Sequence, residues 1–193
     1  MQIKSVPFVI KTTLMYGFLA AGFTLISLIL PWALPPGDPL ESATVEHILG
    51  HIVWGMAAAF ATLSFRYIFA GGLFVIALDA DHLVNFLNID IVGRMAHSIP
   101  FALLAPICMM IIIGRRDFLL GAISFAAVFS HMSLDTFFDA GDFPIFAPFS
   151  EYLTAFDSAD WIILQLIAIS AVIIAKLVTD KKNRIKKKQY NEE

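Results

Sequence analysis

Charged side chains are scarce in this sequence: Asp, Glu, Lys and Arg make up only 15% of its 193 residues, whereas 59% are hydrophobic. This balance excludes an ordinary soluble domain and is typical of a chain embedded in a bilayer. Cysteine is nearly absent as well. The one thiol, Cys108, excludes both an intrachain disulfide and a zinc site built from thiolates.

Long apolar runs are what the sequence does contain. Six of them are long enough for a helix that crosses a hydrocarbon core of about 30 Å, which takes about 20 residues. We place them near residues 12–34, 47–65, 67–86, 97–114, 117–138 and 160–179. The sequence therefore predicts an all-α fold, a polytopic membrane bundle of about six transmembrane helices. In this prediction residues 1–180 form a single transmembrane helical domain and residues 181–193 form a basic cytoplasmic tail.

Lys and Arg are distributed unevenly between the predicted loops. With the N-terminus inside, twelve of the thirteen basic residues fall on the inner side and Arg94 alone falls outside. The inner residues are Lys4, Lys11, Arg66, Arg115, Arg116, Lys176, Lys181, Lys182, Arg184, Lys186, Lys187 and Lys188. Because cytoplasmic loops accumulate Lys and Arg, we expect an integral protein of the cell or inner membrane with both termini in the cytoplasm.

Ionisable residues at the outer ends of the predicted spans need compensation, because an acidic residue deep in a bilayer is disfavoured by about 2.5–3.5 kcal/mol on insertion scales. All five histidines fall on this outer side, together with three carboxylates. Asp79 and His82 are three residues apart and His131 and Asp135 four apart, so each pair shares a helix face. Helical bundles build metal sites from such pairs. We therefore predict a shared metal site with the ligands His51, Asp79, Asp81, His82, His97, His131 and Asp135.

The ligand types narrow the choice of metal. Imidazole and carboxylate without thiolate suit Zn²⁺, Mn²⁺ or Fe²⁺, and of these divalent transition metals we favour zinc. Seven candidate ligands exceed the usual four of one zinc ion, so two ions with a bridging water as nucleophile are the natural inference, while a single ion stays open. His47 lies near the interface, and we interpret it as a polar residue at a helix end.

Four motifs in the middle of the chain resemble those of the YdjM-like family, LexA-regulated inner-membrane proteins described as metal-dependent hydrolases. They are, in order, Gly50-His51 with Gly55, Leu78-Asp79-Ala80-Asp81-His82, Ala96-His97-Ser98, and Ser130-His131 through Asp135 to Gly141 and Ala147-Pro148. The third motif usually begins with a histidine in that family. Here Val92 stands in its place and the arginine is shifted by one position to Arg94, which leaves one candidate ligand fewer for a second ion.

The resemblance implies metal-dependent hydrolysis. The His-x-x-x-Asp spacing of His131 and Asp135 is also similar to that of zinc-dependent phospholipase C enzymes, which by analogy suggests a phosphoester substrate. We therefore expect a hydrolase whose site opens to the outer face of the membrane, with Asp81 and Arg94 as its candidate catalytic residues. Asp81 is expected to bridge two ions or to orient another ligand, and Arg94 or Asn85 to stabilise developing charge.

A membrane lipid or lipid-linked substrate is expected, because the loop between residues 138 and 161 is rich in aromatic side chains that suit the headgroup layer. Two other classes of function stay open. A transporter of divalent metal or protons needs ionisable residues through the membrane depth, and the inner halves of the predicted helices carry none. A non-catalytic structural subunit of a membrane complex is permitted by the missing histidine. We expect no nucleic-acid partner, and a homo-oligomer stays open.

Overall fold

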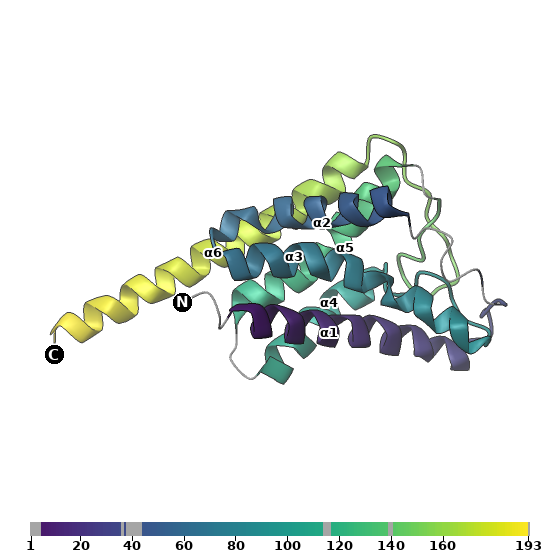
Figure 1. The fold of residues 1–193 in the computed structure, drawn as a ribbon, viewed down its shortest axis with the longest axis horizontal. Coiled ribbons are helices and arrows are strands. Elements are labelled where there is room, and N and C mark those ends of the chain that lie inside the picture. The colour runs from purple at the N-terminus through teal and green to yellow at the C-terminus, as the bar shows by residue number, and fades with distance from the viewer. Residues whose placement is uncertain (1–4, 36, 38–43, 114–116, 139–140, 193) are drawn as a thin grey trace.

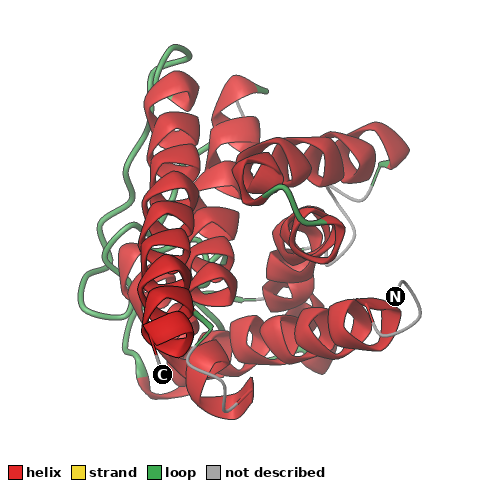
Figure 2. Ribbon diagram, turned by 90° about the vertical axis from the view of Figure 1, so that its left-hand side faces the viewer, coloured by secondary structure: helices red, strands yellow, loops and turns green. Residues whose placement is uncertain are grey.

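The computed structural model of the protein describes residues 5–35, 37, 44–113, 117–138 and 141–192. Within these ranges the regular structure is helical apart from two isolated bridges, as Figure 2 shows. The elements in chain order are α1 (Ser5–Thr24), η1 (Leu25–Ile29), α2 (Val45–Ala59), η2 (Phe60–Thr62), α3 (Phe65–Leu78), η3 (Asp79–Leu87), α4 (Ile99–Ile113), α5 (Phe118–Phe137) and α6 (Trp161–Glu192). The predicted all-α membrane bundle of about six helices is confirmed.

Helix α5 forms the core of the bundle (Figure 1) and is buried along most of its length. It packs against α2, α3, α4 and α6, while α1 packs against α3, η3 and α4. Small residues let α2 and α3 approach closely, since a Cβ on Gly55 would lie 2.5 Å from the carbonyl oxygen of Gly71. Such contacts are common between membrane helices, because lipid gives no hydrophobic drive for their association.

The close approach at Gly55 predicts that Gly55→Ala lowers the thermal unfolding midpoint of the detergent-solubilised protein. Overpacking costs about 1–3 kcal/mol, and each kcal/mol shifts the midpoint of a chain of this size by about 2–4 °C. Gly22→Ala is the matched control, because no atom lies within 4 Å of a Cβ added there. Equal unfolding midpoints for the two variants would show that α2 and α3 can move apart to admit the added methyl group without a loss of stability.

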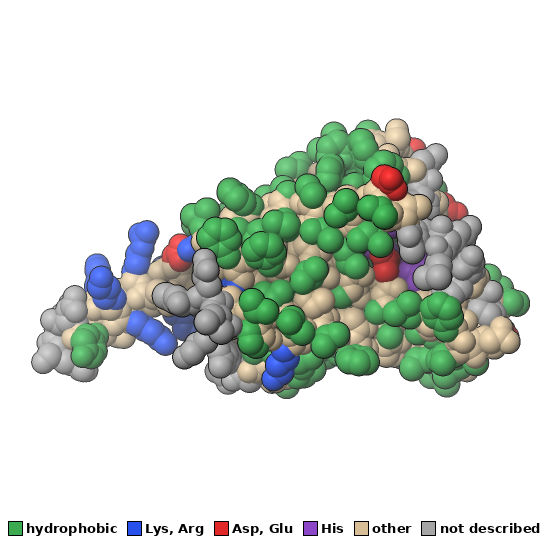
Figure 3. Space-filling view, in the orientation of Figure 1, with side chains coloured by type: hydrophobic (Ala, Val, Ile, Leu, Met, Phe, Trp, Pro, Cys, Tyr) green, Lys and Arg blue, Asp and Glu red, His purple; other side chains and the backbone are tan. Residues whose placement is uncertain are grey.

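Four helical stretches are long and apolar enough to cross a membrane, namely Ser5–Ile29, Phe65–Leu87, Phe118–Phe137 and Trp161–Tyr190. Helices α2 and α4 have 15 residues each, which amounts to about 22 Å of rise and is less than the hydrocarbon thickness. Hydrophobic side chains cover much of the visible face of the bundle (Figure 3), as expected for helices in lipid. Four of the six predicted spans thus correspond to helical stretches that are long and apolar enough to cross a membrane.

The first helix differs from its predicted bounds of 12–34. Its described part begins at Ser5, and the polar side chain of Thr12 is accommodated inside the helix by donating its hydroxyl to the carbonyl oxygen of Phe8 at 2.8 Å. Its last turn, η1, ends at Ile29. The next residue, Leu30, has an extended backbone, because Pro31 follows it and a proline disfavours helical backbone in the residue before it.

The start of α1 and the end of α6 lie at the same end of the bundle, and the last turns of α6 extend beyond it (Figure 1). With 32 residues and about 48 Å of rise, α6 continues without a break through residues 181–192 of the predicted tail. The Lys and Arg side chains visible in Figure 3 lie towards this end of the molecule, and the visible histidine lies towards the opposite end. Lys4, Arg115, Arg116 and residue 193, which contribute to the predicted orientation and tail, lie outside the described residues.

Candidate metal centre

The seven predicted ligands meet at the end of the bundle opposite the start of α1. They are His51 on α2, Asp79, Asp81 and His82 on η3, His97 in the turn before α4, and His131 and Asp135 on α5. Their ring nitrogens and carboxylate oxygens form one continuous set of contacts between 3.1 and 3.9 Å. The sequence prediction therefore selects residues that the fold brings into a single cluster.

The helix changes type where it enters this cluster. Helix α3 ends at Leu78, and the chain continues as the 3-10 helix η3. With three residues per turn, side chains three positions apart lie above one another, so Asp79 and His82 point the same way, with His82 Nε2 3.9 Å from Asp79 Oδ1. The predicted span over residues 67–86 is thus an α-helix followed by a 3-10 helix.

One oxygen of Asp79 is the meeting point of three imidazoles. Asp79 Oδ1 lies 3.3 Å from His131 Nε2 and 3.8 Å from His97 Nε2, in addition to its contact with His82. The four groups come from η3, α5 and the turn before α4, which are distant in sequence. Asp79 therefore joins the separate parts of the cluster through a single atom.

Asp81 has a different place in the cluster, because it is fully buried behind His97. Its Oδ2 accepts a hydrogen bond from the backbone N–H of Ala96 at 3.3 Å and lies 3.1 Å from His97 Nδ1. A carboxylate that holds one ring nitrogen of a histidine leaves the other nitrogen directed at the centre, which is the usual arrangement behind a metal-bound imidazole. This geometry favours orientation of His97 over a bridging role for Asp81.

His131 is fixed in the same manner from a different side. Its Nδ1 donates a hydrogen bond to the carbonyl oxygen of Val75 at 2.8 Å, so the tautomer leaves the lone pair of Nε2 facing Asp79. One turn later on α5, Asp135 Oδ1 lies 3.1 Å from His51 Nε2 and Asp135 Oδ2 lies 3.5 Å from His131 Nε2. Helix α5 thus presents an imidazole and a carboxylate to the same point.

The unpaired atoms of the cluster match the requirements of a cation. His97 Nε2, Asp81 Oδ1 and Asp135 Oδ1 are buried and have no hydrogen-bond partner among the described residues, although buried polar groups are normally paired. Ligands about 2.0–2.1 Å from a tetrahedral zinc ion lie about 3.3 Å apart, close to the contacts seen here. Three overlapping sets of ligand atoms each lie within 4.8 Å of one another: His47, His51, Asp79 and His131; Asp79, His82 and His97; and His97, His131 and Asp135. The residues therefore fit one or two divalent cations.

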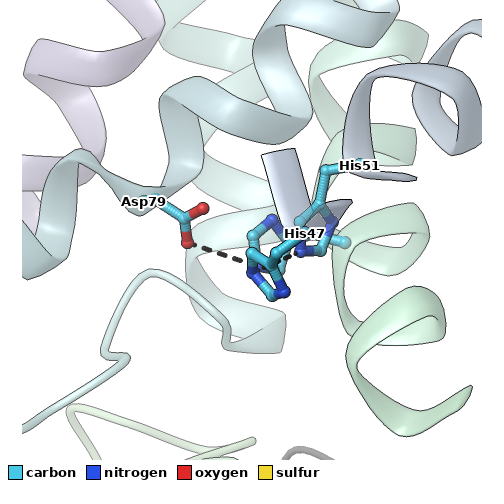
Figure 4. Close-up of side chains that lie close together, drawn as sticks. His47, His51 and Asp79 are labelled. Carbon is cyan, nitrogen blue, oxygen red and sulfur yellow. Dashed lines mark hydrogen bonds and ion pairs between the residues drawn. The ribbon is translucent and has the colours of Figure 1, made fainter. Parts of the chain in front are cut away.

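His47 belongs to this cluster, so its interpretation as only a polar residue at a helix end is wrong. Figure 4 shows His47 and His51 side by side on α2, with Asp79 directed towards them from the neighbouring helix. His47 Nε2 lies 2.9 Å from His51 Nε2 and 3.9 Å from Asp135 Oδ1. The four-residue spacing of the two histidines was the sequence signal for this arrangement.

The cluster is partly exposed. His51, Asp81, His97, His131 and Asp135 are buried, whereas the side chains of Asp79, His82, Arg94 and His47 are 25%, 20%, 21% and 16% exposed. Arg94 reaches this exposed side with its Nη2 3.7 Å from Asp135 Oδ2 and its guanidinium carbon 5.3 Å from the centre of the Phe143 ring. A ligand approaching the cluster therefore meets Asp79, His82 and the Arg94 guanidinium first.

Comparison with known proteins gives one match. A family model described as YdjM inner membrane protein matches residues 43–190, which include the four motifs and every residue of the cluster. No curated protein and no solved structure matches the chain. The match covers most of the chain and agrees with its apolar helices. The chain therefore belongs to the YdjM inner membrane protein family and is an integral membrane protein.

Proposed function

We propose that this protein is a membrane-bound metal-dependent hydrolase that cleaves a phosphoester in a lipid or lipid-linked substrate at the outer face of the membrane. The observation that carries the proposal is the convergence of three imidazole Nε2 atoms on Asp79 Oδ1. Two of these rings, His97 and His131, have their Nδ1 atoms held by a carboxylate and a carbonyl. A histidine whose second ring nitrogen is held in this way by a carboxylate or a carbonyl is typical of a metal ligand.

The side chains divide into binding and positioning roles. The ligands in this proposal are His51, Asp79, His82, His97, His131 and Asp135, and zinc is the metal that we favour. A divalent cation bound there supplies Lewis-acid polarisation of the phosphoester and activation of water. Asp81 is a positioning residue, because it holds His97 and the backbone of Ala96 from behind. Arg94 binds the phosphoryl group, since a guanidinium matches the oxygens of a phosphate and stays charged.

The surroundings of the exposed side support a lipid substrate. Phe143 is buried with its ring 6.3 Å from that of His97, and its backbone pairs with Thr154, which ties the loop before α6 to the cluster. Beyond this anchor the loop exposes Phe146, Phe149 and Tyr152. Exposed aromatic side chains favour the interfacial layer of a membrane, where the headgroup of a lipid would reach Arg94.

The distribution of charge supports an outward-facing site. The Lys and Arg side chains visible in Figure 3 lie towards the end of the bundle opposite the cluster, whereas Arg94 lies at the cluster itself. Basic residues favour the cytoplasmic side, so the cluster faces outward in this proposal. Transport is less well supported, because α1, α3 and α4 contain no Asp, Glu or His, and α5 contains none before His131.

The proposal is tested by hydrolysis of phospholipids and of a lipid-linked pyrophosphate by the purified, zinc-loaded protein. Arg94→Ala is expected to lower kcat/KM about 10²-fold, the usual effect of removing one group that stabilises developing charge, with bound zinc unchanged. Arg94→Lys should recover only part of the kcat/KM lost in Arg94→Ala, because an ammonium lacks the planar set of N–H donors with which a guanidinium binds two phosphate oxygens. Arg184→Ala, on the exposed end of α6, is the control. No phosphate or headgroup release from any substrate by zinc-loaded wild type would contradict the proposal.

A further inference from the structure

His47 is placed at the cluster by the cap of its own helix. The Thr44 side chain accepts a hydrogen bond from the backbone N–H of His47 at 3.2 Å, which fixes the start of α2 at Val45. His47 therefore lies in the first helical turn, and His51 follows one turn later on the same face. This local geometry brings the two Nε2 atoms to 2.9 Å from each other.

A hydrogen bond between the two rings does not account for the surroundings of His51. Its Nε2 lies close both to His47 Nε2 and to Asp135 Oδ1, at 2.9 and 3.1 Å, while its Nδ1 is buried with no hydrogen-bond partner among the described residues. A proton on His51 Nε2 can be donated to only one of these two neighbours. Without that proton, the lone pair of Nε2 faces the Asp135 carboxylate and is repelled by it. A cation among the lone pairs of both imidazoles and the carboxylate accounts for both close approaches of Nε2.

We propose that His47 is a metal ligand, and that it completes a four-ligand cation position with His51, Asp79 and His131. The ligand atoms of these four residues all lie within 4.8 Å of one another. This inference rests on the proposed function, since it concerns the same centre.

The assignment separates two cation positions that share Asp79. The first has the four ligands that include His47, and Asp135 lies beside them with its Oδ1 3.1 Å from His51 Nε2, so this position is closed. The second set consists of Asp79, His82 and His97. Three ligands leave a coordination position open, as in catalytic zinc sites. This second position also includes His82 and Asp79, on the exposed side of the cluster, so it is the position that meets the substrate.

Zinc stoichiometry tests the assignment. The purified full-length protein is equilibrated with Zn²⁺, freed of excess ion by gel filtration and analysed for zinc per chain. His47→Ala is expected to lose one zinc equivalent relative to wild type. Glu46→Ala, at the exposed neighbouring position of the same turn, is expected to lose none. Full zinc retention by His47→Ala would overturn the assignment and leave the hydrolase proposal intact. A wild-type protein without zinc would instead overturn the metal centre itself.

Direct ligation has a spectroscopic signature that a structural role of His47 does not reproduce. In His47→Cys loaded with Co²⁺, a thiolate ligand gives a charge-transfer absorption between sulfur and cobalt. The wild-type protein is the matched control, because it retains Cys108, which lies on α4 and outside the cluster. We expect the band in the variant and not in wild type. Its absence from a folded, cobalt-loaded His47→Cys protein would place residue 47 outside the coordination sphere.

Discussion

Asp79→Asn is expected to remove bound metal and to lower lipid phosphoester hydrolysis about 10³-fold or more, the largest effect of any single substitution in the centre. Asp79 Oδ1 is the atom on which His82, His97 and His131 converge. Asparagine keeps the shape of the side chain but removes its negative charge, and an amide in one of its two orientations places N–H donors where a cation must lie. A loss of 10³-fold corresponds to about 4 kcal/mol of transition-state stabilisation.

The measurement combines zinc content with turnover on the same preparation. Asp90→Asn is the matched control, because Asp90 is an exposed acid shortly after η3 that takes no part in the described contacts of the cluster. It should retain both zinc and activity. Wild-type zinc content together with wild-type turnover in Asp79→Asn would remove Asp79 from the centre. A variant that elutes and unfolds like wild type excludes misfolding as the cause of a loss.

The seven ligands could be predicted from the sequence for an energetic reason. Carboxylates and imidazoles at the ends of apolar runs are costly unless something compensates them, so their presence in Asp79-Ala80-Asp81-His82 and at His131 and Asp135 indicates a common partner. The lengths of the apolar runs likewise predicted the number of helices, because a span needs a minimum length. Both inferences follow from what a bilayer requires of any chain inside it, and neither requires knowledge of how the helices pack against one another.

Other features depend on tertiary contacts that a sequence does not display. The orienting role of Asp81 requires the backbone of Ala96 to pass beside it, and the switch from α3 to η3 at Asp79 has no local signal such as proline. His47 was misinterpreted because a histidine in the first turn of a helix is readily explained by solvent. Only its neighbours on α5 and η3 reveal the cluster, since Asp135 lies 3.9 Å away and Asp79 shares its set of ligand atoms.

Removal of bound cations by a chelator is expected to lower the thermal unfolding midpoint of the protein by about 10 °C. The cluster places three carboxylates, Asp79, Asp81 and Asp135, within one set of contacts, and two of these are buried. Without a cation their mutual repulsion is opposed by Arg94 and by those neighbouring imidazoles that take up a proton. A ligand present at about 1,000 times its dissociation constant stabilises the folded state by about 4 kcal/mol, and each kcal/mol is worth about 2–4 °C in a chain of this size.

The fall in the unfolding midpoint should depend on which metal is added back and on whether the metal ligands are intact. A nonspecific effect of the chelator on the protein would depend on neither. Zn²⁺ added after chelation should restore the midpoint, whereas Mg²⁺ should not, because imidazole-rich sites select transition metals over hard cations. The midpoint of Asp79→Asn should change little on chelation, since that variant holds little metal to lose. Elemental analysis must first show that the chelated wild-type protein is free of zinc. If its midpoint then equals that of the zinc-loaded protein, no cation stabilises the cluster, and the buried carboxylates must be balanced by protons and by Arg94 alone.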